Sequence, residues 1–145
     1  MKIYVSYAQP DSDFAASVAK QLMVQGHHVW MDQLSLLPGD NWQLAAGKAL
    51  QDSDAMVVLL SPNSARSQGQ QHEINYALGS DQYAGRVIPV FIRPTKEYPW
   101  ILDRFSTVQA DNDPAEVGRK INQVLRKGRL MDRLTKTRKV FKGYT

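Results

Sequence analysis

The strongest constraint on the fold of this 145-residue chain is an uninterrupted apolar run, Ala55–Leu60, with the sequence AMVVLL. A strand with one face in water alternates apolar and polar residues, whereas a strand covered on both faces is apolar throughout. A membrane-spanning helix would need about 20 apolar residues, far more than this run contains. The run therefore predicts the central strand of a parallel sheet that has helices on both faces.

Strand-like segments rich in β-branched and aromatic residues alternate with amphipathic segments along the rest of the chain. Further strands are expected at residues 2–7, 27–31, 86–92 and 105–109. Helices are expected at residues 12–25, 42–50, 72–78, 97–103 and 114–125. This alternation implies right-handed crossovers, and it predicts a single α/β domain, a flavodoxin-like doubly wound five-stranded parallel sheet with strand order 2-1-3-4-5.

Three local signals add detail to this outline. Asp11 or Ser12 is expected to cap the first helix, which ends at Gly26, a residue typical of helix C-termini. The pair Asp113-Pro114 is an N-cap followed by a favourable first helical residue, and it opens the last helix. Pro89 donates no amide hydrogen, so some irregularity is expected in the fourth strand.

In doubly wound sheets, ligands bind beyond the carboxyl ends of the strands. Here that edge comprises residues 6–10, 32–41 and 61–70. The second of these segments is expected to be a loop with a turn at Pro38-Gly39. A ligand site of this protein should therefore be built from these three segments and from the helices that follow them.

Missing motifs narrow the chemistry at this edge. Neither G-x-G-x-x-G nor G-x-x-x-x-G-K-[ST] occurs, which argues against hydride transfer and against P-loop hydrolysis. A phospho-receiver site needs acidic residues after the first strand and an aspartate after the third. The residues at these two places are Ser6-Tyr7 and Ser61-Pro62, which excludes phosphoacceptance.

The chain has no cysteine, which removes thiolate nucleophiles, disulfides, iron–sulfur clusters and Cys-ligated zinc together. Its histidines are His27, His28 and His72, and the adjacent pair begins a strand, so no helix presents two imidazoles to a metal. No metal site is expected.

The absence of cysteine fits a reducing compartment, and the N-terminus lacks a secretory pattern. A cytoplasmic location is therefore expected.

The net charge of +4 is unevenly distributed. Residues 126–145 contain eight basic residues and one acidic residue, a net charge of +7, whereas residues 1–125 contain ten basic and thirteen acidic residues, a net charge of −3. A role in binding nucleic acid or an anionic membrane is thus conceivable only for the basic tail. The alternative for this tail is a solvated extension or one docked on a partner.

Glu73 stands out among the ionisable residues because it follows the central strand on the next helix, beside the predicted cleft. Its position alone also suits a solvated glutamate that interacts favourably with the helix N-terminus. Its neighbour His72 is expected to be an ordinary residue on the helix surface. Position therefore leaves the role of Glu73 open between a site residue and a surface acid.

Three segments together resemble the Toll/interleukin-1 receptor (TIR) domain family. The sequence SPNSARS at residues 61–67 followed by EINYAL at 73–78 resembles its serine-rich loop and helix glutamate. The sequence VSYA at 5–8 resembles its first motif. The sequence VWMD at 29–32, followed by LLPG and Trp42, resembles its second strand and its long recognition loop, the BB loop. The resemblance covers about residues 1–125, and it predicts a TIR domain over 1–128 with a basic C-terminal extension over 129–145.

The resemblance implies a prokaryotic-type enzyme that cleaves NAD+ in antiviral defence or innate immune signalling, with Glu73 as its catalytic residue. Residues implied to bind the substrate are Tyr7, Ala8, Trp30 and Asp32. Each has a structural alternative, because Trp30 also suits a buried strand position, Tyr7 suits strand-end packing, and Asp32 suits the start of a turn. Many enzymatic members carry a tryptophan four residues before the glutamate and a cysteine next to it, whereas this chain has Gly69 and Gln70.

A carboxylate suits cleavage of the bond between nicotinamide and ribose, because nicotinamide leaves as a neutral pyridine and needs no general acid. The transition state resembles an oxocarbenium ion, which a nearby anion stabilises. Glu73 would supply this anion, and Trp30 would stack on the cationic nicotinamide. Water as acceptor gives ADP-ribose, and a hydroxyl or ring nitrogen of the same molecule gives a cyclic ADP-ribose isomer. NAD+ is then the substrate, and no cofactor is expected.

The rival interpretation is a non-enzymatic TIR adaptor that binds other TIR domains through residues 32–42, with Glu73 as a surface acid. Both interpretations include self-association through TIR–TIR contacts. A separate sensor or effector protein is expected as a partner, because no sensor domain is recognisable in the chain. The sequence leaves the choice between enzyme and adaptor open.

Overall fold

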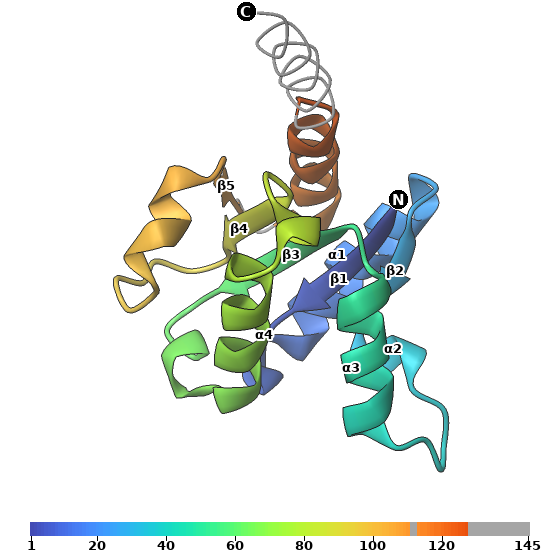
Figure 1. Cartoon of the computed structure of the whole chain (residues 1–145). Helices are drawn as coiled ribbons and strands as arrows, with labels where there is room; N and C mark the ends of the chain where they lie inside the picture. Colours follow the sequence, from blue (N-terminus) through green and yellow to red (C-terminus); the bar gives the residue numbers. More distant parts are fainter. Residues whose placement is uncertain (111–112, 128–145) are drawn as a thin grey trace, which may run out of the picture.

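The computed structural model describes residues 1–110 and 113–127, and its core is a parallel sheet of five strands in the order β2-β1-β3-β4-β5 (Figure 1). The strands are β1 Lys2–Ser6, β2 His28–Trp30, β3 Ala55–Leu60, β4 Val87–Phe91 and β5 Val108–Gln109. Every neighbouring pair is parallel. The predicted fold class and strand order are confirmed.

Helices cover both faces of the sheet. The α-helices are α1 Ser12–Val24, α2 Asp32–Ser35, α3 Trp42–Asp52, α4 Gln68–Leu78 and a last helix over residues 114–127. In the described part of the chain, the connections contain four short 3-10 helices: η1 Gln9–Asp11, η2 Ser64–Arg66, η3 Asp81–Tyr83 and η4 Trp100–Arg104. Figure 1 shows α3 and α4 together on one face of the sheet. Within the described residues, no helix is long and apolar enough to cross a bilayer.

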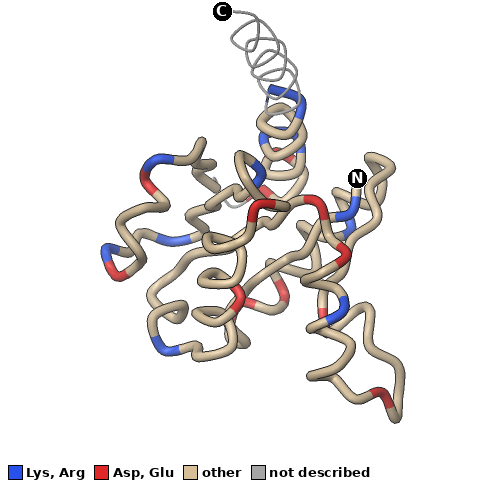
Figure 2. Tube along the Cα trace, in the orientation of Figure 1, with Lys and Arg blue, Asp and Glu red and all other residues tan. Residues whose placement is uncertain are grey.

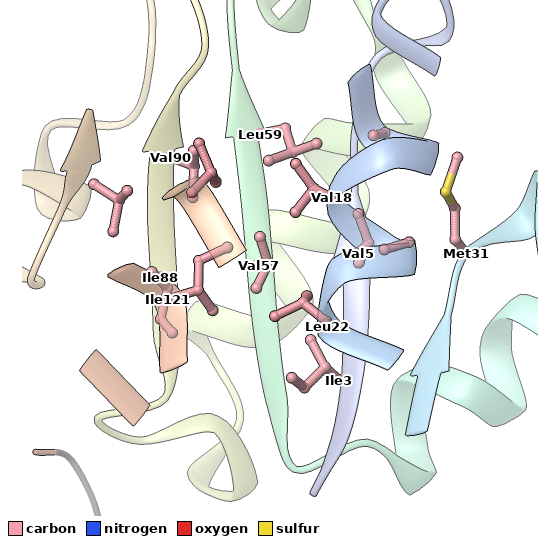
Figure 3. Close-up of a cluster of buried hydrophobic side chains, with 14 of the residues drawn as sticks. Ile3, Val5, Val18, Leu22, Met31, Val57, Leu59, Ile88, Val90 and Ile121 are labelled. Atoms are coloured by element: carbon pink, nitrogen blue, oxygen red, sulfur yellow. The ribbon is translucent and has the colours of Figure 1, made fainter. Parts of the chain in front are cut away.

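The central strand β3 is buried along its whole length, as the AMVVLL run predicted. Successive side chains point to opposite faces of a strand, so Val57 and Leu59 pack under α1 and the last helix (Figure 3). Met56 and Val58 enter a second cluster on the opposite face. Two cores thus sandwich the sheet.

Two segments differ from the sequence-based expectation. Residues 32–41, expected as a loop, begin with the single turn of α2. α4 begins at Gln68, well before residue 72, because the Ser67 side chain accepts a hydrogen bond from the backbone N–H of Gln70 at 3.2 Å and caps the helix. The residues of this first turn are not apolar, so the apolar periodicity of the sequence does not indicate it.

Pro89 lies inside β4 without disrupting the sheet. The N–H of Ile92 bonds to Leu60 in β3 at 2.9 Å, and the carbonyl of Phe91 accepts the N–H of Ala110 beyond β5 at 3.0 Å. The backbone N–H and C=O groups of successive residues point to opposite sides of a strand. Pro89 lies two residues before Phe91, so its backbone groups point away from β3 and toward β5, a strand that begins only at Val108. The missing N–H therefore removes no bond to β3.

Asp11 does not cap α1 with its side chain, in contrast to one of the two expectations for this helix start. Its buried carboxylate instead accepts hydrogen bonds from Ser61 Oγ at 2.5 Å and Asn63 Nδ2 at 3.1 Å, and pairs with Arg93 at 3.2 Å. These partners come from the segments that follow β3 and β4. Asp11 thus ties the carboxyl ends of three strands together.

The last helix begins as predicted, because the Asp113 side chain accepts the N–H of Ala115 at 3.1 Å. Its buried residues Val117, Ile121 and Leu125 pack into the core shared with α1. Its described end carries Arg126 and Lys127, where blue marks basic residues in Figure 2. The predicted extension over residues 129–145 lies outside the described residues.

Candidate active site

Glu73 points from α4 toward β1, where two hydroxyl groups hold its carboxylate. Ser6 Oγ donates a hydrogen bond to Oε1 at 3.0 Å, and the Tyr4 hydroxyl donates one to Oε2. Tyr4 in turn stacks on Trp30 of β2, with ring centroids 4.9 Å apart and an interplanar angle of 19°. The pairing of Tyr4 with Trp30 in the β1–β2 register places these two rings side by side.

Gln70, one turn before Glu73, anchors α4 to the sheet. Its side chain is 1% exposed. Its Nε2 donates to the backbone carbonyls of Leu59 at 2.8 Å and Ser6 at 3.3 Å. In the sequence, Gln70 stands out only because many enzymatic members of the family have a cysteine at this position. Gln70 lies three residues before Glu73, and residues at this spacing share one face of a helix. This spacing could have predicted that Gln70 lies near the site.

A cavity of about 370 Å³ opens in front of Glu73. It is lined by residues of β1, β2, α2, α3 and α4 together with the turns between them: Tyr4, Tyr7, Gln9, Trp30, Asp32, Trp42, Gln43, Ala46, Gly47, Leu50, Ser67, Gly69, Gln70, His72 and Glu73. The structure thus brings four of the five predicted site residues, Tyr7, Trp30, Asp32 and Glu73, to one cavity. The predicted location beyond the carboxyl ends of the strands agrees with this arrangement.

Ala8 is the predicted site residue that is not among those lining the cavity. Its side chain is 1% exposed, and its carbonyl accepts the N–H of Asp11 at 2.8 Å in the turn after β1. Its contact with a substrate stays a prediction.

Asp32 connects the loop after β2 to β1. The Tyr7 hydroxyl donates a hydrogen bond to Asp32 Oδ1, and the backbone N–H of Gln33 donates to the same oxygen at 2.6 Å. Asp32 therefore lies at the start of α2, which agrees with its alternative role as a residue that begins a turn, and it also lines the cavity. Contact with a ribose hydroxyl stays a prediction.

The environment of Glu73 makes its carboxylate unusually basic. Burial raises the pKa of Glu73 to about 7, and the negative charge of Asp32 adds to this shift, while the hydrogen bonds from Tyr4 and Ser6 oppose it. Burial and the neighbouring Glu73 also raise the pKa of Tyr4. The Tyr4 hydroxyl therefore keeps its proton and remains a donor to Glu73 when the carboxylate is charged.

Two further cavities do not contain Glu73. One, of about 370 Å³, lies between the β1–β2 edge and α3 and shares Trp30 with the first. The other, of about 670 Å³, lies beyond the carboxyl ends of β4 and β5. Among residues 1–110 and 113–127, no cluster of three or more histidine, aspartate or glutamate side chains could hold a metal ion. The cavity at Glu73 combines a perturbed acid with aromatic walls, and it is therefore the candidate active site.

A sequence model of the TIR domain matches residues 3–125. The chain belongs to the TIR domain family. This TIR domain is 30% identical over 112 residues to a protein of Paracoccus denitrificans named NAD(+) hydrolase PdTIR, a match that covers 75% of the chain and 36% of that protein. It is 26% identical over 110 residues to a protein of Bacteroides thetaiotaomicron named 2' cyclic ADP-D-ribose synthase BtTIR, with coverage of 74% and 37%. The chain spans little more than a third of the length of these curated relatives.

Among solved structures, the fold of this TIR domain resembles that of the TIR domain of the Toll-related receptor TRR-2 from Hydra magnipapillata. The TM-score is 0.68 at 19% sequence identity, and the match covers 88% of this chain and 97% of that one. This likeness supports the fold.

Proposed function

We propose that this TIR domain cleaves the N-glycosidic bond between nicotinamide and ribose in NAD+. The observation that carries the proposal is the partly buried carboxylate of Glu73, held by Tyr4 and Ser6 at the wall of an aromatic-lined cavity. The names of the two bacterial relatives support the substrate class. NAD+ is the substrate in this proposal, and no metal or further cofactor takes part.

The proposed reaction requires one anion and no acid. The bonding electron pair leaves with the pyridine nitrogen, so nicotinamide departs as a neutral molecule and the ribose becomes an oxocarbenium ion. The carboxylate of Glu73 stabilises this cation electrostatically. Water then adds to the ribose carbon and loses a proton, which gives ADP-ribose. Attack by a hydroxyl or ring nitrogen of the same molecule, with loss of its proton where it carries one, gives a cyclic ADP-ribose instead.

The other predicted site residues take binding roles in this proposal. Trp30 stacks on the cationic nicotinamide ring, which is attracted to the electron-rich face of an indole. Asp32 and Tyr7, joined by their hydrogen bond, border the ribose. Ala8 contributes only through its backbone, since its side chain is buried.

Incubation of the purified chain with NAD+, followed by mass spectrometry, tests the proposed function. We expect free nicotinamide together with ADP-ribose or with a cyclic ADP-ribose, which is lighter than ADP-ribose by one water. The mass and the chromatographic retention of the second product identify the acceptor. An unchanged NAD+ pool at high protein concentration would leave the adaptor interpretation as the better one.

Tyr4→Phe is expected to shift the pH dependence of NAD+ cleavage. The reaction needs charged Glu73, so the rate should fall as the pH drops through about 7, the pKa of this carboxyl in the folded protein. The hydrogen bond from the Tyr4 hydroxyl lowers that pKa, and its removal should therefore move the acidic limb of the profile to higher pH. Tyr98→Phe, which removes a hydroxyl that donates to Asp103 instead, is the matched control. Superimposable profiles of Tyr4→Phe and the unmodified protein would contradict this role.

Self-association is a second part of the proposal. Exposed apolar side chains on the recognition loop and the start of α3, namely Leu34, Leu37, Trp42 and Leu44, form a surface that a neighbouring copy can cover. Gly39 adopts a positive φ of 88°, and Asp40 accepts the N–H of Leu37 at 2.8 Å, so the loop holds a defined turn. The adaptor alternative uses the same surface.

Activity per molecule is expected to rise with protein concentration, because a copy that covers this surface also borders the cavity, which Trp42 lines. A dilution series of the NAD+ assay, compared with molecular mass from light scattering, measures this. Specific activity should increase over the range in which the mass increases. A constant specific activity across that range would show that each domain is complete by itself.

The biological setting belongs to the same proposal. A separate sensor or effector protein would supply the trigger or receive the product, in defence or immune signalling, and a cytoplasmic location would give access to NAD+. The basic tail over residues 129–145 would bind an acidic partner, nucleic acid or an anionic membrane through its charge.

A further inference from the structure

The α3 wall of the cavity has a regular pattern of side-chain size. Trp42, Ala46 and Leu50 recur every four residues, so they lie on one face of α3, and all three line the cavity together with Gly47. From Trp42 to Leu50 this face extends about 12 Å. A large ring at one end, small residues in the middle and a leucine at the other end make this wall concave.

Trp42 lies at the mouth of the cavity. α3 leads into β3 at the amino end of that strand, so α3 begins with Trp42 at the carboxyl edge of the sheet. α4 follows the carboxyl end of β3 and begins at the same edge, where Gly69 lies in its first turn. Figure 1 shows these two helices running in the same direction over one face of the sheet. Trp42 and Gly69 therefore lie in the first turns of two helices that begin at the same edge of the sheet, and both line the cavity, with Gly69 one turn before Glu73 on α4.

The space next to Gly69 is open. A Cβ atom at this position would meet no other heavy atom within 4 Å. Trp42 is 61% exposed, and within residues 1–110 and 113–127 no other ring or cation lies against it. Trp30 differs, because it is partly buried and already stacked on Tyr4. The cavity thus has an exposed indole on its α3 wall and open space at Gly69 on its α4 wall.

We infer that Trp42 is a substrate-binding residue whose indole stacks on a flat heteroaromatic base of the substrate at the mouth of the cavity. The inference rests on the proposed function for the identity of that substrate, which has two such bases, nicotinamide and adenine. Stacking suits this place because every base has a π-face, while the open side at Gly69 leaves room for a ring. The reacting bond then lies one turn deeper, at Glu73.

The test separates binding from turnover by using the Glu73→Gln chain. Isothermal titration calorimetry with ADP-ribose and with nicotinamide mononucleotide compares Trp42→Ala, Trp42→Phe and Trp100→Ala in this background. Trp100 is the matched control, since it is 69% exposed, lies under Arg104 and does not line the cavity. Trp42→Ala should weaken one of the two ligands about 5- to 150-fold. Loss of ADP-ribose binding identifies adenine as the stacked base, and loss of the mononucleotide identifies nicotinamide.

Kinetics in the otherwise unmodified chain provide a second readout. Trp42→Ala should raise KM for NAD+ more than it lowers kcat, Trp42→Phe should restore most of the loss, and Trp100→Ala should match the unmodified protein. Unchanged affinity for both ligands would overturn the inference, as would a defect that disappears at high protein concentration, which would place Trp42 in the self-association surface alone. Ligand binding that depends on Trp42 in a chain that never cleaves NAD+ would uphold the inference and refute the proposed function.

Discussion

Glu73→Gln is expected to lower the rate of nicotinamide release by at least about 100-fold, the loss typical when one electrostatic stabiliser of a transition state is removed. Glutamine keeps the size of the side chain and can still accept a hydrogen bond from Tyr4 or Ser6, but it carries no charge. The oxocarbenium ion would then form beside a neutral amide. Initial rates of nicotinamide release at saturating NAD+ measure the effect.

The matched control is Glu97→Gln, since Glu97 is exposed and does not line the cavity at Glu73. Its rate should equal that of the unmodified protein. If folded Glu73→Gln protein also kept the full rate, Glu73 would be a structural acid of the cleft, and the adaptor interpretation would gain support.

The same substitution is expected to stabilise the fold at neutral and alkaline pH. The pKa of Glu73 is raised from its ordinary value of 4.5 to about 7 in the folded protein. Below pH 4.5 the carboxyl is protonated in both the folded and unfolded states, and burial of Glu73 carries no charge penalty. As the pH rises to 7 the unfolded chain ionises first, so the folded state loses relative stability, by up to about 3 kcal/mol for a shift of this size.

Glutamine has no charge to bury, so the difference in unfolding free energy between the variant and the unmodified protein should grow with pH and level off above about 7. Urea denaturation from pH 4 to pH 9 on both proteins gives these free energies. A difference that stays constant across this range would mean that Glu73 ionises as easily in the fold as in the unfolded chain.

These two outcomes follow from one arrangement. Burial of the carboxylate against Tyr4 strengthens its field at the cavity, because little water screens it, and the same burial costs folding free energy. Enzymes often keep a functional group in an environment that lowers the stability of the fold. An adaptor that used Glu73 only as a surface acid would gain nothing from it.

Local patterns were enough to predict several elements. The apolar run at Ala55–Leu60 indicated a doubly covered strand because burial on both faces leaves no polar alternation, and β3 is buried throughout. The pair Asp113-Pro114 indicated a helix start because both residues act within one turn, and Asp113 does cap the last helix. The alternation of strands and helices indicated a parallel sheet, because parallel strands need crossovers, and five such units suggested the strand order of the flavodoxin-like fold.

Contacts between segments that are far apart in the sequence could be identified only from the tertiary structure. Tyr4 and Glu73 are 69 residues apart, and Asp11 and Ser61 are 50 apart. Asp11 looked like a helix cap in the sequence, yet its carboxylate bonds across to the segment after β3, where buried hydroxyl and amide donors need an acceptor. Local patterns could not reveal that preference.

Periodicity and chain direction indicated a parallel sheet and the edge at which Glu73 lies, because neighbouring residues carry these patterns. The resemblance to the TIR family, and not periodicity, implied Trp30, Asp32 and Tyr7 as site residues. The tertiary structure was needed to show that Tyr4 and Ser6 hold Glu73, that Gln70 anchors its helix, and that the exposed Trp42 lines the same cavity as Gly69. The physical reason is that the pKa of a carboxyl and the exposure of a ring depend on what surrounds them in space, and segments far apart in the chain provide those surroundings.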